Sequence, residues 1–420
     1  MVTGSKSTIL FPFTIKGDPL IDVIITENTR LASGDTLLNL YSAHGVFLAL
    51  AKEGLDARCI DLMSSVEGGM PVPSVTNFAD ICCYAVFFGN KVSAFRHMME
   101  ARRRKKPPSL IIAFGPFAAA FPDEIISGGL ADMVVAYDPE FVIPAVLRKG
   151  DKPPVLKNIP NLSFMHQRKV VHTRKHSFQE LDKVPFIGPY LYSQGHRPAL
   201  VLSARGCQYH CVYCDRNALW GGGVRQRSVA NVLAEIKELV EGQQVQSIQF
   251  LDEDLAADHR RLVALCEGMR RIKGSFSWVC CARVDSVNQK ILLLMGRSHC
   301  RNVYFGMESA SSKVLRRIGK KYERQDIINA VHWAQEAGIK VGVMITIGNP
   351  GEEEIDRKLT LSTLKELGGE VSITTNWLVI LPGTAFFRKG LREGWFTRKS
   401  YFEDEGLVLY HEKSRGDAHG

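Results

Sequence analysis

Two series of short, continuously apolar runs, each alternating with helical patterns, most constrain the fold of this chain. Runs such as IDVIITE at 21–27 and SLIIAFG at 109–115 are mostly apolar. Strands of this kind are buried on both faces, which is typical of parallel sheets covered by helices. The 420 residues exceed the usual size of one domain. The sequence therefore predicts two α/β domains.

The first series occupies residues 1–150 and predicts a doubly wound, Rossmann-like domain. The predicted strands cover 21–27, 57–62, 82–89, 109–115 and 132–138, with helical patterns at 40–53, 92–104, 122–127 and 141–148. In such sheets ligands bind outside the carboxyl ends of the strands. Residues 151–197 are irregular and contain several prolines and one candidate hairpin, so we expect an interdomain connector there.

The second series occupies residues 198–385 and contains six strand–helix units. The predicted strands cover 199–205, 247–251, 276–284, 302–308, 340–348 and 372–380, with helices at 229–241, 258–271, 288–295, 325–337 and 353–367. Six units are too few for a closed barrel of eight, so the pattern predicts a partial (β/α)6 barrel with its active site at the carboxyl ends of the strands. The charged and aromatic residues 386–420 are predicted to form a cap or tail.

Composition and charge exclude several classes of protein. With 45% hydrophobic and 23% charged residues, the chain is neither disordered nor collagenous. Part of the net charge of +9 lies in the run ARRRKK at 101–106, which has no interleaved aromatic residues and is interpreted as a solvated helix end rather than a nucleic-acid face. No apolar run is long enough to span a bilayer, and no secretory signal pattern is present. We therefore expect a cytoplasmic protein without a membrane partner.

Three cysteines follow the first strand of the predicted barrel. Cys207, Cys211 and Cys214 have the spacing C-x3-C-x2-C, whereas the other cysteines are scattered through apolar segments. Thiolates at this spacing can bind three corners of a four-iron four-sulfur cluster and leave the fourth iron open to a substrate or cofactor. Two alternatives remain: a zinc site with His210 as fourth ligand, which its adjacency to Cys211 disfavours, and a surface loop that holds three thiols by chance.

This loop resembles the signature of the radical S-adenosylmethionine (radical SAM) superfamily, and the resemblance extends from residue 199 to 380. It implies one 4Fe-4S cluster whose open iron is chelated by S-adenosylmethionine. One electron then cleaves the sulfonium to a 5′-deoxyadenosyl radical, so that the cofactor carries the difficult chemistry and the protein positions it. The resemblance also implies a small-molecule substrate and an external one-electron reductant such as flavodoxin or ferredoxin.

The same resemblance assigns the contacts to S-adenosylmethionine. It assigns the amino group to the acidic segment Asp252, Glu253 and Asp254. It assigns the carboxylate to Arg283 and the ribose to Glu308. It assigns the adenine to backbone at Tyr213 and in the turn formed by Gly348, Asn349 and Pro350. Taken singly, they could also be a helix N-cap, a surface ion pair and a turn.

The N-terminal part is similar to the cobalamin-binding domain found in one branch of this superfamily. The run FGPFAA at 114–119 stands where that branch has Gly-Gly-Pro-His-x-Thr, so Phe114, Phe117 and Ala119 replace the first glycine, the histidine and the threonine. The candidate cobalamin-facing residues are Asn28, Asn90, Gly115, Pro116 and Tyr137. These departures leave cobalamin binding open, and the alternative is an inherited domain that only packs against the barrel or shapes the substrate cavity.

The expected function follows from whether cobalamin binds. With cobalamin, the resemblance implies methyl transfer to an unactivated carbon or a phosphorus centre in a small-molecule or natural-product pathway. Without cobalamin, it implies a dehydration, rearrangement, redox change or heteroatom exchange. Methylthio transfer is disfavoured because Cys59, Cys82 and Cys83 lack the pattern of a second cluster. A non-catalytic iron–sulfur redox sensor is the alternative from another class, and Tyr209 or His210 is a candidate donor of a proton or hydrogen atom.

Overall fold

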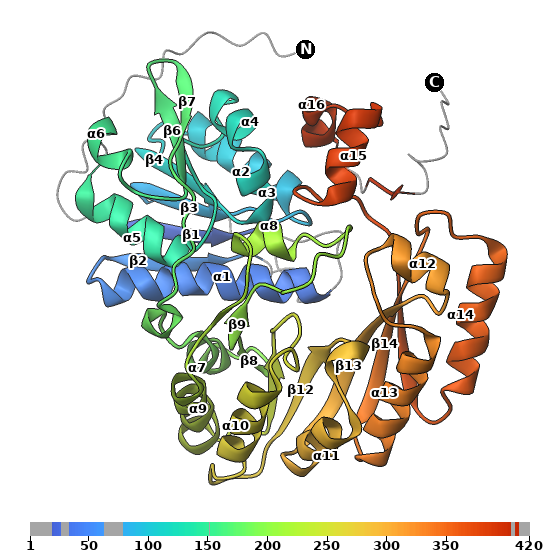
Figure 1. Cartoon of the computed structure of the whole chain (residues 1–420). Coiled ribbons are helices and arrows are strands. Elements are labelled where there is room, and N and C mark those ends of the chain that lie inside the picture. Colours follow the sequence, from blue (N-terminus) through green and yellow to red (C-terminus); the bar gives the residue numbers. More distant parts are fainter. Residues whose placement is uncertain (1–18, 27–32, 63–78, 151, 405–407, 411–420) are drawn as a thin grey trace. The chain divides into compact units, whose positions relative to one another are not determined.

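The computed structural model describes residues 19–26, 33–62, 79–150, 152–404 and 408–410 of the chain (Figure 1). The chain divides into two compact units. The first unit contains Met1–Thr29 and Val46–His176, and the second contains Arg30–Gly45 and Ser177–Gly420. Within the described residues, no helix is long and apolar enough to cross a membrane.

The first unit is built on a seven-stranded sheet in the order β2-β1-β3-β4-β5-β6-β7. The strands are β1 (Ile21–Ile25), β2 (Ala57–Asp61), β3 (Ile81–Ala85), β4 (Leu110–Phe114), β5 (Met133–Val135), β6 (Leu162–His166) and β7 (Lys169–His172). The first five strands are parallel, and β1, β3, β4 and β5 are buried throughout. The predicted doubly wound sheet is confirmed, and its strand order reverses between β1 and β3, where sheets of this kind bind ligands.

Helices alternate with the parallel strands in the described residues up to 156. They are α1 (Ser33–Lys52), α2 (Lys91–Arg103), α3 (Pro116–Ala120), α4 (Pro122–Ser127), α5 (Pro139–Lys149) and α6 (Pro153–Leu156). The boundary between the units falls inside α1, after Gly45. The predicted first domain, residues 1–150, therefore differs from the first unit in two places. The unit excludes Arg30–Gly45, and it extends to His176.

The predicted connector 151–197 is not a separate segment. Its hairpin extends the first sheet, because β6 pairs antiparallel with β5, and β7 with β6. Leu162 and Phe164 are buried, which explains why these residues join the core. The part after His176 belongs to the second unit, where Ile187 and Leu191 of α7 (Ile187–Ser193) are buried.

The second unit contains six parallel strands in sequential order, which confirms the predicted partial barrel. The strands are β8 (Ala199–Val201), β11 (Ser247–Phe250), β12 (Ser277–Ala282), β13 (Cys300–Glu308), β14 (Lys340–Ile347) and β15 (Val371–Trp377). The predicted strand 199–205 is interrupted, and its second part forms β9 (Ala204–Arg205), which pairs antiparallel with β10 (Arg225–Gln226).

Helices follow these strands in the expected alternation. They are α8 (Arg216–Trp220), α9 (Val229–Lys237) with the π-helical turn η2 (Glu238–Gly242), α10 (His259–Met269), α11 (Gln289–Arg297), α12 (Ser312–Arg317), α13 (Arg324–Glu336) and α14 (Glu354–Glu366), with the 3-10 turns η1 (Leu181–Lys183) and η3 (Val284–Ser286). After β15 come α15 (Ala385–Glu393) and α16 (Arg398–Glu403). The buried Tyr401 of α16 donates a hydrogen bond to the carbonyl oxygen of Ile380.

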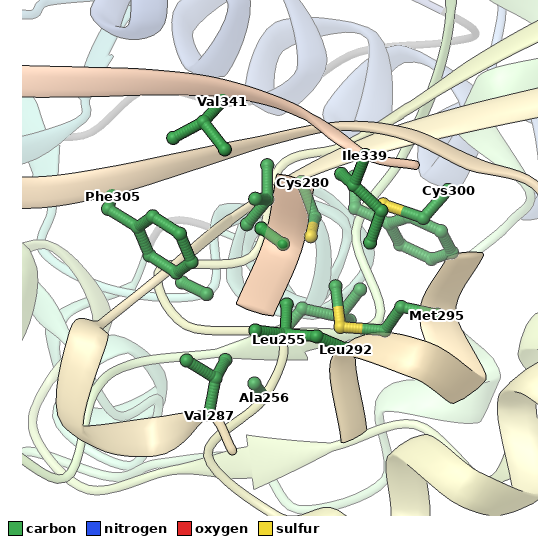
Figure 2. Packing of buried hydrophobic residues seen from close by; sticks show 14 of the residues in the cluster. Leu255, Ala256, Cys280, Val287, Leu292, Met295, Cys300, Phe305, Ile339 and Val341 are labelled. Carbon is green, nitrogen blue, oxygen red and sulfur yellow. The ribbon is translucent and has the colours of Figure 1, made fainter. Parts of the chain in front are cut away.

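The core of the second unit is apolar and continuous (Figure 2). Trp278 is fully buried, packs edge-on against Phe250 and donates its indole N–H to the carbonyl oxygen of Ser298. Cys280 and Cys300 lie in this core with Phe305, as Figure 2 shows. These cysteines therefore serve as small apolar side chains, and the core fixes the strands whose carboxyl ends carry the polar residues of the site.

Candidate functional site

Cys207, Cys211 and Cys214 lie on the loop between β9 and α8 as free, half-buried thiols. The loop is anchored at Val212, whose N–H donates to Ile318 O (3.2 Å) and whose carbonyl oxygen accepts from Phe386 N–H (3.3 Å). Burial raises the pKa values of Cys207 and Cys214, and a bound metal overcomes such a shift because coordinating thiols are deprotonated outright. Three free thiols on one anchored loop match the donor set of a three-cysteine cluster.

A zinc site with His210 has no support in this geometry. Within the described ranges, no three His, Cys, Asp or Glu side chains are grouped as ligands of a single metal ion. His210 is exposed. The thiolates of a cubane cluster each bind a different iron, so they do not have to surround a single point.

Gly206 allows the cysteine loop to leave β9 in its observed direction. Its φ angle is +89°, and a Cβ atom added to it would lie 1.9 Å from the carbonyl oxygen of Gly223. The contact arises because β9, which ends directly before Gly206, pairs with β10, which begins shortly after Gly223. Arg205 lies opposite Arg225 in this pairing. Only glycine combines this backbone conformation with this close approach.

We expect Gly206→Ala to destabilise the second unit by about 2–5 kcal/mol, since it adds left-handed strain to a backbone clash. Gly222→Ala is the matched control. Gly222 has a similar φ angle of +85° but nothing within 4 Å of an added Cβ, so its cost is limited to about 1–2 kcal/mol of strain. Urea unfolding and the iron content of the reconstituted protein measure the difference. Equal costs in the two variants would contradict the close-approach argument.

The acidic segment after β11 contains three carboxylates with different partners. Asp252 is buried and accepts from Ser203 N–H (2.9 Å) and Ser203 Oγ–H (2.6 Å), so it joins the ends of two neighbouring strands. Glu253 lies 3.3 Å from Arg216 Nε and 3.4 Å from Trp220 Nε1, and burial raises its pKa to about 7. Both side chains therefore have partners within the protein.

Asp254 differs from its neighbours because one of its carboxylate oxygens has no hydrogen-bond partner. Its Oδ1 accepts from Ser286 Oγ (2.8 Å) and Arg283 N–H (3.3 Å), whereas its Oδ2 is buried without a partner. Burial raises the pKa of Asp254 to about 6. The residue lines a cavity that Gly206 and Cys207 also line. A buried oxygen without a donor is rare in proteins, and a cationic ligand in this cavity would supply one.

Arg283 connects the third barrel strand with the cysteine loop. Its Nη1 lies 3.6 Å from Cys211 Sγ, and its Nε and Nη2 each donate to Asp285 at 2.8 Å. Its guanidinium carbon lies 3.6 Å from the centre of the Tyr209 ring. The planar guanidinium therefore stacks on Tyr209 while facing a thiol. Tyr209 therefore packs against Arg283, whereas His210 is exposed.

Glu308 forms the polar centre on the other side of the loop. It accepts from Tyr213 Oη (3.0 Å), Lys320 Nζ (3.0 Å) and Thr346 Oγ1 (2.6 Å). Burial would raise the pKa of Glu308, but Lys320 and these hydrogen bonds outweigh burial and hold it below its ordinary value. Lys320 was not predicted as a site residue, because the run IGKK does not distinguish the buried Lys320 from the exposed Lys321.

The turn after β14 lies next to this centre. The N–H groups of Gly348 and Asn349 donate to Glu352, and Asn349 Nδ2 donates to the carbonyl oxygen of Thr346. Asn349 Oδ1 is buried without a partner, and Pro350 follows in the same turn. Since Thr346 also contacts Glu308, the turn and the glutamate form one continuous polar surface.

In the first unit, the predicted cobalamin-facing residues lie at the carboxyl edge of the sheet, except Asn28, which falls outside the described residues. Asn90 donates to Ala85 O (2.9 Å) and Thr26 Oγ1 (3.3 Å), and its Oδ1 accepts from Phe87 N–H (2.7 Å). Thr26 and Asn90 lie where the strand order reverses, between β1 and β3. Asn90 fixes the backbone of the loop after β3 through its hydrogen bonds to Ala85 and Phe87.

The Gly115 loop is tightly packed. Gly115 has a φ angle of +103°, and an added Cβ would lie 2.7 Å from Val86 O. Pro116 opens α3, and Tyr137 is half-buried. Phe117 is buried and contacts an aromatic group, so the position that would carry a histidine in the related domain serves the core here. The group consists of Phe88, Phe95 and Phe121.

Residues 201–364 match the family described as the Radical SAM superfamily. A match to this family implies a 4Fe-4S cluster and S-adenosylmethionine. An uncharacterised methyltransferase of Pyrococcus horikoshii is 28% identical over 56% of this chain and 53% of its own length. A tRNA-2-methylthio-N(6)-dimethylallyladenosine synthase of Clostridium novyi is 30% identical over 42% of this chain and 41% of its own length. The chain spans about half the length of these curated relatives.

Two solved structures match most of the length of this chain. The radical S-adenosylmethionine methyltransferase TsrM of Kitasatospora setae, solved with cobalamin and a 4Fe-4S cluster, matches with a TM-score of 0.72 over 89% of this chain and 75% of its own, at 15% identity. The cobalamin-dependent S-adenosylmethionine radical enzyme OxsB matches with a TM-score of 0.72 over 90% of this chain and 61% of its own, at 18% identity. The chain therefore shares its fold with these two enzymes.

Proposed function

We propose that this protein is a radical SAM enzyme that cleaves S-adenosylmethionine to a 5′-deoxyadenosyl radical. The observation that carries the proposal is the anchored three-thiol loop beside the unpartnered Oδ2 of Asp254. The thiols of Cys207, Cys211 and Cys214 would hold the cluster, which supplies the electron that cleaves the sulfonium. Asp254 would accept a hydrogen bond from the amino group of the bound cofactor.

The remaining polar residues would position the cofactor. Arg283 faces Cys211 and would pair with the methionine carboxylate. Glu308 and Tyr213 would lie near the ribose, and the turn at 348–350 would lie beside the adenine. Asp252 would act indirectly, because both of its oxygens are engaged with Ser203. It holds the strand end from which Glu253 and Asp254 extend.

For the reaction that follows, we propose cobalamin-dependent methyl transfer to an unactivated carbon or phosphorus of a small molecule. When bound, cobalamin supplies a methyl carrier. The polar edge formed by Thr26 and Asn90 at the strand-order reversal supports this, as does the fold shared with TsrM and OxsB. Because Phe117 is buried, these residues fit a cobalamin that receives no imidazole ligand from the Gly115 loop.

One observation favours a second candidate, a cobalamin-free radical enzyme doing a dehydration, rearrangement, redox change or heteroatom exchange. The rings around Phe117 fill the position where the related domain presents polar side chains. Methylthio transfer has less support, since Cys82 and Cys83 are fully buried within β3, where they could not hold a second cluster without opening the sheet.

Anaerobic reconstitution tests these proposals. Protein produced with hydroxocobalamin is analysed for iron, sulfide and cobalt. It is then reduced with dithionite in the presence of S-adenosylmethionine. We expect about four irons per chain and the release of 5′-deoxyadenosine without substrate. A redox sensor would bind iron but release no 5′-deoxyadenosine. Stoichiometric cobalt supports methyl transfer, and well-folded, iron-loaded protein without cobalt would reject it in favour of the second candidate.

A further inference from the structure

The turn between α12 and α13 (Figure 1) carries exposed basic side chains, and its backbone contacts the cysteine loop. Arg316, Arg317 and Lys321 are exposed, and Gly319 is exposed between them. Together with a hollow of about 320 Å³ that Arg316, Gly319 and Lys321 help to line, these residues form what we call the 316–321 surface. The site described above uses only the buried Lys320 of this segment.

The backbone of the 316–321 surface is in contact with the backbone of the cysteine loop. Ile318 O accepts a hydrogen bond from Val212 N–H (3.2 Å). A Cβ atom on Gly319 would lie 3.3 Å from His210 O and 3.6 Å from the Cα atom of Cys211. Gly319 has no side chain, so its backbone closely approaches the backbone of His210 and Cys211.

The charge of the 316–321 surface is largely uncompensated. Arg317 and Lys321 have no ion-pair partner among the residues that the structure describes. Arg316 lies 4.0 Å from Glu323, but both side chains are about 70% exposed, and ion pairs of this kind contribute little. An exposed cluster of positive charge attracts and orients acidic partners.

We propose that the 316–321 surface docks an acidic one-electron carrier protein of the flavodoxin type. The carrier would lose one electron and the cluster held by the three cysteines would gain it, with no proton or group transferred. This inference rests on the proposed function, since the cluster must be reduced before it can cleave S-adenosylmethionine. What it adds is the place of docking and the residues that select the partner.

A nucleic acid fits this surface less well than an acidic protein. Tyr322, the aromatic residue that follows this segment, is buried, and its hydroxyl donates to the carbonyl oxygen of Gly306. It therefore offers no ring for base stacking. The run at 101–106 is the denser cluster of basic residues in the sequence, but it ends α2 in the first unit, whereas the cysteine loop belongs to the second unit.

The test compares two charge-reversal variants of the reconstituted protein. Arg316→Glu/Lys321→Glu alters the 316–321 surface, and Arg103→Glu/Lys105→Glu makes the same change in net charge at exposed positions of the first unit. Calorimetry measures the binding of a bacterial flavodoxin at low and moderate salt. We expect the first variant to bind at least about tenfold more weakly and the second within about twofold of the native protein. Native binding should weaken with salt.

Stopped-flow absorbance then measures the reduction of the cluster. With flavodoxin hydroquinone, we expect the first variant alone to be slow, whereas dithionite should reduce all three proteins equally. Equal weakening in both variants, no flavodoxin binding by the native protein, or binding of an RNA oligonucleotide that depends on Arg316 and Lys321 would overturn the docking proposal. Native protein that binds flavodoxin through this surface but releases no 5′-deoxyadenosine with dithionite would instead overturn the proposed function.

Discussion

Replacement of Cys207, Cys211 or Cys214 by alanine is expected to abolish the cleavage of S-adenosylmethionine. Each thiol would hold a different iron, so the loss of one leaves two irons without a protein ligand, counting the iron that is open by design. We expect the release of 5′-deoxyadenosine to fall on the order of a thousandfold or more, because the protein has no other means of generating the radical. Product analysis under dithionite, with iron and sulfide content, measures the effect.

Cys59→Ala is the control for this series. Cys59 is also a half-buried free thiol, but it lies in β2 of the first unit. Its replacement should leave the iron content and the cleavage rate unchanged. Full iron content and turnover in any one of the three loop variants would remove the basis of the proposed function, since a two-thiol site cannot hold the cluster as described.

The strands and helices of both units could be predicted from the sequence because their apolar residues have the period of the element that buries them. The predicted strand 340–348 and the observed Lys340–Ile347 differ by one residue, and the helix predicted at 325–337 is observed at Arg324–Glu336. The three cysteines could also be identified from the sequence as candidate cluster ligands, since that prediction depends only on spacing within a few residues. Local patterns are sufficient for features of this kind.

The connector and the interrupted strand could not be predicted in this way. The hairpin at 162–172 joins the first sheet through pairing with β5, about thirty residues earlier, and nothing within the hairpin specifies that partner. Similarly, the predicted strand 199–205 is broken because Asp252 binds Ser203 and β9 pairs with Arg225–Gln226. Contacts between distant residues decide both outcomes.

The same limit applies within the site. Asp252, Glu253 and Asp254 are adjacent acidic residues, but only the structure separates Asp252, which binds Ser203, from Asp254, which has an unpartnered oxygen. Lys320 and Lys321 are adjacent lysines, of which one is buried against Glu308 and the other is exposed. Adjacent residues of the same type therefore differ in burial and hydrogen bonding, and these differences indicate different roles that residue type alone does not distinguish.

This division predicts a large difference between substitutions of the two lysines. Lys320→Met should destabilise the second unit by about 3–5 kcal/mol, because it leaves the buried carboxylate of Glu308 without its charge partner. Lys321→Met, one residue later and exposed, should change the free energy of unfolding by less than about 0.5 kcal/mol. Urea unfolding of the reconstituted proteins at neutral pH measures both, with a probe for the second unit because a two-unit chain need not unfold in one step.

A double variant separates the loss of the pair from the loss of the individual side chains. Glu308→Gln alone leaves Lys320 buried and unpaired, whereas Lys320→Met/Glu308→Gln removes both charges and should recover about 1–3 kcal/mol relative to the sum of the single variants. The pKa of Glu308 is held below its ordinary value, so the pair stabilises the native fold at neutral pH and loses this effect only as the pH falls through that lowered pKa. The deficit of Lys320→Met should therefore shrink in acid. If Lys320→Met costs no more than Lys321→Met, or if the single effects simply add, Glu308 and Lys320 do not form the coupled centre described here.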